Sequence, residues 1–299
     1  MTLKACLRSM RLRTLPLSLA GIVLGVLLAA TVCDYDLLTV VLLALTTVSL
    51  QILSNLSNEL GDTLSGTDRS DRQGIHYSIQ DGEMTVPEMK RLIACVAAVC
   101  CVLGLGMVWS AFGSPLRPLA LAFLALGAAA VWAAMHYTLG KNPYGYRGLG
   151  DIFVFVFFGL ATVCGGYFLT CLEWSWRILL PAAAIGCFSV AVLNVNNIRD
   201  MKSDAETRVT VAMRLGVPRA RIYQTVLIAA GWVLMTVFAA TEQPFSWWHF
   251  IYVLSLPGYL KHLKGVWTLQ DRALDPMLPL LVISTFTFAL LGGLGFLFS

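Results

Sequence analysis

Long uninterrupted apolar stretches are the feature that most limits what this chain can fold into. They run for about 16 to 22 residues and lack the alternation of apolar and polar residues that is typical of strands. A helix that crosses a bilayer needs roughly 20 such residues, whereas a spanning strand needs roughly 10. In lipid, every backbone N–H and C=O must be paired within the protein, which leaves helix bundles and closed barrels. We therefore expect an all-α protein with several transmembrane helices.

Nine segments are long and apolar enough to be predicted as transmembrane helices, and we expect them to form a single domain over residues 1–299. The chain is only 13% charged, about half the roughly 25% of a soluble domain, so lipid suits its surface better than water. The shortest segment contains Pro257 and Gly258. The predicted segments are 15–33, 37–57, 91–112, 117–138, 151–172, 177–198, 222–240, 247–263 and 277–298.

The distribution of Lys and Arg predicts how these helices are oriented. If the N-terminus lies inside, the inner segments hold 19 of the 21 Lys and Arg residues, and the outer loops keep only Arg117 and Arg177. Such an excess is typical of cytoplasmic loops. We therefore expect a cytoplasmic N-terminus, an external C-terminus and a functional site on the cytoplasmic side. The net charge of +4 is small and does not form a nucleic-acid-binding face, so we expect no nucleic-acid partner.

A first group of carboxyl and amide side chains follows the second predicted helix. If that helix continues, Asn58 and Asp62 lie one turn apart on the same face. Gly66 would then end the helix and let the chain fold back, which would bring Asp68 close to Asp62. The group comprises Asn55, Asn58, Glu59, Asp62 and Asp68.

A second group lies at the end of the sixth predicted helix. Asn196, Asp200 and Asp204 are spaced four residues apart, so they stack along one helix face, and Asn197 lies beside them. Either group alone could consist of ordinary loop charges that cap helices. Two similar groups at the same membrane face favour one shared site.

Rows of carboxylate and amide side chains along one helix face suit Mg²⁺, which prefers oxygen ligands. In proteins this ion is usually held by one or two carboxylates together with substrate phosphate. With Mg²⁺ between them, two facing motifs could clamp a pyrophosphate, and nearby cations could supply counter-charge. The candidate Mg²⁺ ligands are Asn58, Glu59, Asp62, Asp68, Asn196, Asp200 and Asp204. The candidate counter-charges are Arg69, Arg72, Lys141, Arg199, Lys202 and Arg208.

A third segment, residues 136–151, mixes aromatic residues, glycines and two cations after the fourth predicted helix. One interpretation is a turn-rich loop with interfacial tyrosines. The functional interpretation is that Tyr137 and Lys141 reach a central cavity.

These motifs resemble those of the UbiA superfamily of intramembrane aromatic prenyltransferases. Residues 58–68 are similar to its first Asp-rich motif, and Asp200 to Asp204 are similar to its second. Residues 51–62, 137–151 and 196–216 resemble the menaquinone branch of this family, the 1,4-dihydroxy-2-naphthoate polyprenyltransferases. There are two departures: Glu59 stands where the family has Asp, and Arg208 takes the place of a lysine.

The resemblance implies nine helices around a cavity that opens sideways to lipid, in a bacterial inner membrane. It implies transfer of a polyprenyl group from polyprenyl diphosphate to 1,4-dihydroxy-2-naphthoate, with Mg²⁺ as cofactor. Loss of CO₂ and diphosphate would give demethylmenaquinol for menaquinone biosynthesis. The catalytic residues expected on this basis are Asp62, Asp200, Tyr137 and Lys141. The expected substrate-binding residues are Asn55, Arg69, Arg72, Tyr144, Tyr146, Asn197, Arg199, Lys202 and Arg208.

Two alternatives remain open at this stage. One is a prenyltransferase of the same family that acts on another aromatic acceptor, such as 4-hydroxybenzoate. The other is a cation-coupled transporter, because acidic residues and interrupted helices within the membrane also fit transporters. Transporter sites lie near the middle of the bilayer, whereas both acidic motifs here lie at one face, which favours a diphosphate site.

Overall fold

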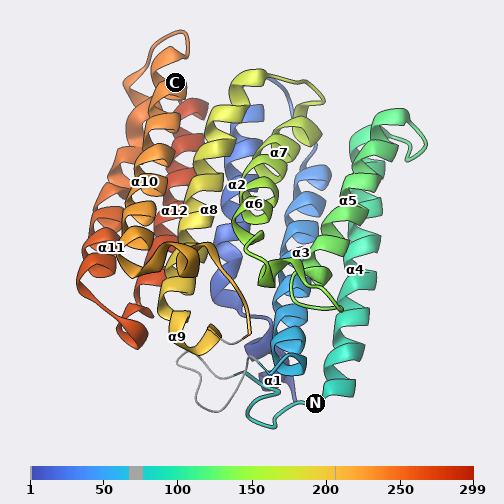
Figure 1. Cartoon of the computed structure of the whole chain (residues 1–299). Coiled ribbons are helices and arrows are strands. Elements are labelled where there is room, and N and C mark those ends of the chain that lie inside the picture. Colours follow the sequence, from blue (N-terminus) through green and yellow to red (C-terminus); the bar gives the residue numbers. More distant parts are fainter. Residues whose placement is uncertain (1, 67–76, 206) are drawn as a thin grey trace.

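The long apolar stretches form helices that run side by side as a bundle (Figure 1) in a computed structural model that describes residues 2–66, 77–205 and 207–299. Within the described residues, eight helices are long and apolar enough to cross a membrane. The described part of the chain contains no strand beyond an isolated bridge between Arg147 and Val209. The expected all-α, polytopic membrane fold is confirmed.

Several of these spans are built from more than one helical piece. The N-terminal span joins α1 to α2 through a 3-10 turn, and the fifth span contains a π-helical stretch between two α-helices. The elements are α1 Leu3–Ser9, η1 Leu12–Thr14, α2 Leu15–Ala29, α3 Leu37–Leu64, α4 Val86–Phe112, α5 Pro118–His136, η2 Tyr144–Tyr146, α6 Gly150–Val154, η3 Phe155–Ala161, α7 Thr162–Cys171, η4 Trp176–Ile178, α8 Leu179–Arg199, α9 Met201–Asp204, α10 Val211–Thr241, η5 Trp247–Ser255, α11 Leu256–Thr268, η6 Asp271–Leu274 and α12 Met277–Leu297.

The segment predicted as a transmembrane helix over 247–263 takes a different form and is not among the eight candidate spans. Its first part is the 3-10 helix η5, and α11 begins only at Leu256. Pro257 lies in the first turn of α11, where its missing N–H would have no partner in any case. Hydropathy detects the apolar stretch but does not distinguish a 3-10 helix from an α-helix, which explains the difference.

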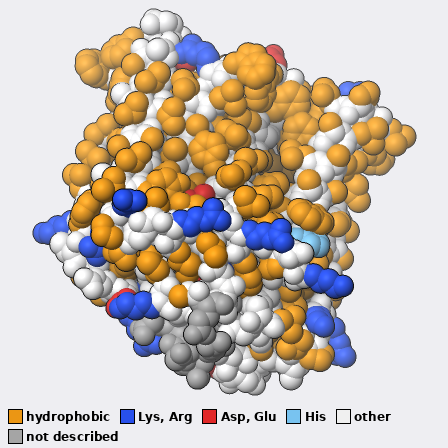
Figure 2. Space-filling model, in the orientation of Figure 1, with side chains coloured by type: hydrophobic (Ala, Val, Ile, Leu, Met, Phe, Trp, Pro, Cys, Tyr) orange, Lys and Arg blue, Asp and Glu red, His pale blue; other side chains and the backbone are white. Residues whose placement is uncertain are grey.

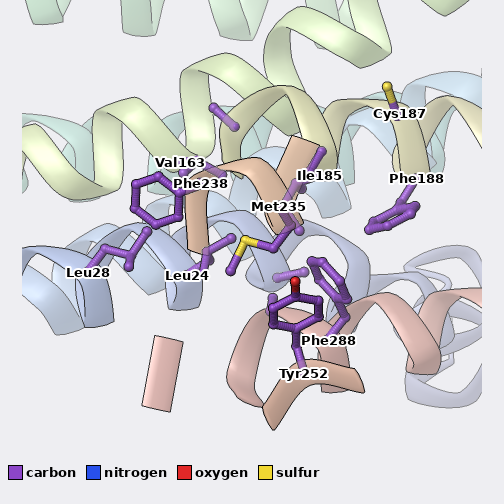
Figure 3. Close-up of a cluster of buried hydrophobic side chains, with 14 of the residues drawn as sticks. Leu24, Leu28, Val163, Ile185, Cys187, Phe188, Met235, Phe238, Tyr252 and Phe288 are labelled. Carbon is purple, nitrogen blue, oxygen red and sulfur yellow. The ribbon is translucent and has the colours of Figure 1, made fainter. Parts of the chain in front are cut away.

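The largest buried cluster lies where α2, α8, α10 and α12 meet, and Figure 3 shows part of it. Phe188 and Phe288 are fully buried and lie edge to face, with ring centres 4.9 Å apart, a geometry that aromatic pairs favour. A Cβ at Gly231 would overlap the Phe188 ring, so a glycine is needed for α10 to approach α8 this closely. This cluster fixes α8, whose C-terminal end carries the second acidic motif.

The two ends of the bundle differ in charge. The N-terminus, α1 and α9 lie at one end in Figure 1, and the C-terminus lies at the other. Figure 2 shows Lys and Arg side chains gathered over the half that contains α1 and α9, below a broad hydrophobic surface. This is the asymmetry expected from the sequence. The side of the membrane that each end faces remains a prediction.

Candidate active site

A cavity of ≈ 350 Å³ lies among α2, α3, α5, the α6–η3–α7 span and the end of α8. Most of its wall is apolar, with Phe123, Phe153 and Phe157 among the lining side chains. The lining also includes polar residues contributed by several elements. They include Arg11, Ser18, Gln51, Ser54, Asn58, Asp62, Tyr137, Asn196, Asn197 and Arg208.

One face of α3 supplies a polar ladder to this cavity. Gln51, Ser54, Asn58 and Asp62 are three or four residues apart, which places them on the same side of the helix. The helix continues to Leu64, and Gly66 follows its cap with a positive φ of 73°. The predicted pairing of Asn58 and Asp62 on one face is therefore confirmed, as is the end of the helix near Gly66.

Asp62 is nearly fully buried, and side chains from two other parts of the chain contact it. The Tyr146 hydroxyl donates a hydrogen bond to its Oδ1 at 2.8 Å. The Arg208 Nη2 lies 3.4 Å from the same oxygen. Tyr146 is held here by η2, and its hydroxyl also lies 2.9 Å from the Ser65 hydroxyl. The loop after α5 and the segment after α9 thus meet at the end of α3.

Arg208 joins the two acidic motifs. Its Nε lies 3.1 Å from Asp204 Oδ2, and its guanidinium lies over the Tyr146 ring at 5.3 Å from the centroid. Burial lowers the pKa of Arg208, but the negative charges of Asp62 and Asp204 outweigh this effect, so the net pKa lies above its ordinary value. A permanently charged cation therefore lies between one carboxylate from each motif.

Asp200 has a different environment from Asp62 and Asp204. It is fully buried and pairs with Arg199 through two bonds, Nε to Oδ1 and Nη2 to Oδ2, each 2.7 Å long. The Arg199 Nη1 also donates to Asp275 Oδ1 at 2.7 Å. Neither Arg199 nor Asp200 lines the cavity, although Asn196 and Asn197 on the preceding turn do. The arrangement fixes the end of α8 against the segment that precedes α12.

Three further predicted site residues also lie away from the cavity wall. Glu59 is fully buried and accepts a hydrogen bond from the Ile79 N–H at 3.0 Å. Lys141 is exposed. Lys202 is mostly exposed and pairs with Asp271 at 2.9 Å. The structure therefore does not bring Glu59, Lys141 or Lys202 to the cavity.

Asn55 stabilises the site without lining the cavity. Its Nδ2 donates to the Met10 carbonyl at 2.9 Å and to Thr14 Oγ1 at 3.0 Å, and it does not line the cavity. At about 100° per residue along α3, Asn55 lies at the edge of the face that carries Asn58 and Asp62, and Glu59 lies about 100° around the helix from Asn58. Asn55 also accepts a hydrogen bond from Gln51 Nε2 at 3.0 Å. The predicted residues Asp68, Arg69 and Arg72 lie outside the described residues.

The aromatic loop after α5 contributes two rings to the wall. Tyr137 and Tyr144 both line the cavity, and the Tyr144 hydroxyl donates to the Ala133 carbonyl at 2.7 Å. Burial, and to a smaller extent Tyr137, raises the pKa of Tyr144, so this phenol remains neutral. A Cβ at Gly61 would collide with Thr138, so the glycine at this position allows the loop to lie directly on α3.

The described residues contain no cluster of three or more His, Cys, Asp or Glu side chains close enough to hold a metal ion. The position between Asp62 and Asp204 nevertheless holds a cation, the guanidinium of Arg208. The amides of Asn58 and Asn196 line the same cavity. These oxygen donors suit Mg²⁺, which needs only one or two carboxylates when a phosphate completes its coordination.

Two groups that line the cavity are not predicted from the sequence. Arg11 is one of four basic residues among the first 13, and no local pattern distinguishes it from the others. Ser18 and Gln51 form a buried hydrogen bond of 2.7 Å. The Gln51 position was detectable, because it lies seven residues before Asn58 and hence on the same face of α3.

The sequence and the fold of the chain are both similar to those of known proteins. The chain matches the model of the UbiA prenyltransferase family over residues 18–278. It is 39% identical to a 1,4-dihydroxy-2-naphthoate octaprenyltransferase of Escherichia coli (strain K12), over 92% of this chain and 89% of that protein. A protein of Haemophilus influenzae (strain ATCC 51907 / DSM 11121 / KW20 / Rd) with the same name is 37% identical, over 99% and 96% of the two chains. The fold is similar to that of a UbiA homolog from Archaeoglobus fulgidus bound to GPP and Mg²⁺, with a TM-score of 0.69, 17% identity and coverage of 98% and 99%.

Proposed function

The chain belongs to the UbiA prenyltransferase family, and from this we propose that it transfers a polyprenyl group from polyprenyl diphosphate to 1,4-dihydroxy-2-naphthoate. The products are demethylmenaquinol, CO₂ and diphosphate, and the reaction is a step in menaquinone biosynthesis. The observation that carries the proposal is the identity of 37% and 39%, over most of both chains, to two proteins named for this octaprenyl transfer. The transporter alternative has no support among these relatives.

The cavity suits the two chemically different halves of a polyprenyl diphosphate. Its apolar wall, with Phe153 and Phe157, suits an isoprenoid chain, and the end with Asp62 and Arg208 suits the diphosphate. We propose that Asp62 and Asp204 hold Mg²⁺, with Asn58 and Asn196 as additional oxygen donors. Asp200, which the sequence also predicted as a ligand, instead anchors the end of α8 through Arg199. When bound there, Mg²⁺ neutralises diphosphate charge that the carboxylates would otherwise repel.

The residues of the chain have separate roles in the reaction. A ring carbon of the acceptor forms a bond to C1 of the allylic chain, the C1–oxygen bond to diphosphate breaks, and the ring carboxylate leaves as CO₂. Arg208 stabilises the negative charge that builds up on the departing diphosphate. The apolar wall excludes water, which would otherwise capture the allylic cation. Tyr137 and Tyr144 shape the aromatic side of the cavity next to the reacting centre.

We also propose that the end of the bundle with α1, α9 and the end of α3 faces the cytoplasm of a bacterial cell, with the protein in its inner membrane. The excess of Lys and Arg on the segments predicted to be inside supports this orientation. Lys202→Cys and Ser114→Cys, each in a background whose eight native cysteines are replaced by serine, test the orientation in intact cells. A membrane-impermeant reagent should label only the residue at 114, and labelling of the residue at 202 alone would reverse the orientation.

The function itself is tested with purified protein in detergent or nanodiscs. We expect release of pyrophosphate and CO₂ when octaprenyl diphosphate, 1,4-dihydroxy-2-naphthoate and Mg²⁺ are all present. Each substrate should be omitted in turn as a control. Efficient turnover with 4-hydroxybenzoate and none with the naphthoate would contradict the proposed acceptor, and absence of turnover with any aromatic acid would contradict the enzyme assignment.

A further inference from the structure

Arg11 has an unusual backbone and is held firmly in place. It lies between α1 and η1 with φ 50° and ψ 52°, a left-handed conformation that residues other than glycine rarely adopt. Asn55 of α3 fixes this turn, because its Nδ2 donates to the Met10 carbonyl and to Thr14 Oγ1. The Thr14 hydroxyl in turn donates to the Arg11 carbonyl at 2.9 Å. Such a conformation persists where the surrounding structure enforces it, often at a functional site.

The turn directs the Arg11 side chain to the cavity. Arg11 lines the cavity, and its guanidinium carbon lies 3.8 Å from the centre of the Tyr77 ring. Its Nε and Nη2 are shielded from solvent and have no hydrogen-bond partner among the described residues. A guanidinium is always charged and carries five N–H donors. Because buried donors are normally hydrogen-bonded, these shielded N–H groups are suited to bind an anionic or carbonyl ligand.

Two other arginines near the site, Arg208 and Arg199, differ from Arg11 because both form ion pairs with carboxylates. Arg208 contacts Asp62 and Asp204, and Arg199 pairs with Asp200 and Asp275. No residue in the described part of the chain forms an ion pair with Arg11, although it carries the same charge. Within that part, the positive charge at the cavity wall is thus compensated at Arg208 and uncompensated at Arg11.

The backbone turn that carries Arg11 is held at a level of α3 before the diphosphate end. Asn55, which holds its turn, comes seven residues before Asp62 on α3, or about 10 Å along the helix axis. Ser18 and Gln51, which are hydrogen-bonded to each other, also line the cavity and provide polar groups on this side. An anion held by Arg11 would therefore lie beside the diphosphate site.

We propose that Arg11 binds the carboxylate of the aromatic acceptor and so selects for acceptors that carry one. The inference rests on the proposed function, in which the acceptor is a naphthoate. The planar guanidinium matches a carboxylate in two parallel hydrogen bonds, and its contact with the Tyr77 ring limits how far it can move. The diphosphate already has Arg208 and the acidic motifs, so the carboxylate is the substrate anion that still needs a partner.

The kinetic test compares three variants: Arg11→Gln, Arg11→Lys and the control Arg13→Gln. Arg13 is exposed, does not line the cavity and lies two residues further along the chain. We expect Arg11→Gln to raise the KM for the naphthoate by about 30-fold, as expected for loss of a charge-assisted pair, and to leave the KM for octaprenyl diphosphate nearly unchanged. Arg11→Lys should have a smaller effect of the same kind, because lysine keeps the charge but lacks the planar pair of N–H donors of a guanidinium. Arg13→Gln should resemble the parent protein.

A binding measurement separates this inference from the proposed function, because it needs no turnover. Titration of 1-hydroxy-2-naphthoate and of 1-naphthol, followed by tryptophan fluorescence, measures the preference for the carboxylate directly. The parent protein should prefer the carboxylated probe, and Arg11→Gln should abolish the preference. A preference that survives Arg11→Gln and Arg11→Lys, or a KM effect confined to the diphosphate substrate, would overturn the inference. If Arg11→Gln abolishes the preference for the carboxylate but the parent protein does not turn over the naphthoate, the proposed function fails and the role of Arg11 stands.

Discussion

The two acidic motifs are similar in sequence, with carboxyl and amide residues four positions apart, but the structure places them in different surroundings. Asp62 of the first motif lies at the cavity wall, where Tyr146 and Arg208 contact it. Asp200 of the second motif lies behind the wall in a two-bond pair with Arg199. Asp204, one turn later, shares Arg208 with Asp62. Residues with equal spacing can therefore have different roles, because the first motif presents its carboxylate to the cavity, whereas the second also uses one to anchor its helix.

Removal of the divalent cation should have the largest effect, because both motifs depend on it. With EDTA in excess, pyrophosphate release should fall to background, since the carboxylates would then repel the diphosphate. Addition of Mg²⁺ should restore the rate. Unchanged turnover in EDTA would mean that Arg208 and other cations alone neutralise the diphosphate.

The Asp62→Asn substitution should have the next largest effect, which we expect on turnover rather than on stability. We expect turnover to fall by about 100-fold to 1,000-fold, the range seen when one group that stabilises transition-state charge is removed. Unfolding in detergent should change little, because asparagine keeps the shape and can still accept from Tyr146. Asp34→Asn, in an exposed loop between α2 and α3, is the matched control. Retained turnover in Asp62→Asn would remove the first motif from the proposed site.

The Arg199→Gln substitution should act first on stability. It leaves the fully buried Asp200 without its two-bond partner, which costs about 3 to 5 kcal/mol in comparable pairs. We expect a clear fall in the midpoint of thermal unfolding in detergent, larger than for Asp62→Asn. An Arg199→Gln protein with unchanged stability and a changed KM for diphosphate would show that Arg199 binds substrate, as the sequence predicted.

The Lys202→Gln substitution should have the smallest effect. Lys202 is mostly exposed, and its pair with Asp271 is a surface ion pair, which contributes about 0 to 1 kcal/mol in general. Turnover and stability should both stay close to those of the parent protein. A large loss of turnover would place Lys202 at the diphosphate, against its position in the structure.

Much of the fold and part of the site could be predicted from the sequence. Hydropathy locates the long helices, and the spacing of Asn58 and Asp62 places both on the cavity face of α3. Other features depend on contacts between distant parts of the chain. The pair of Arg199 with Asp275 joins residues 76 positions apart, and no local sequence pattern predicts it. The direction of Glu59 depends on Ile79, which lies in the loop after α3. The role of Arg11 depends on Asn55 and Tyr77, and both residues are far from Arg11 in the sequence.

The central claim is that Asp62 and Asp204 belong to one diphosphate site. A double-mutant cycle with Asp62→Asn, Asp204→Asn and the double variant, measured as Mg²⁺-dependent pyrophosphate release, tests it most directly. Groups that act as a unit are strongly non-additive. We therefore predict that the double variant is little less active than the less active of the two single variants. Losses that multiply in the double variant would show that the two motifs act independently and would contradict the shared site.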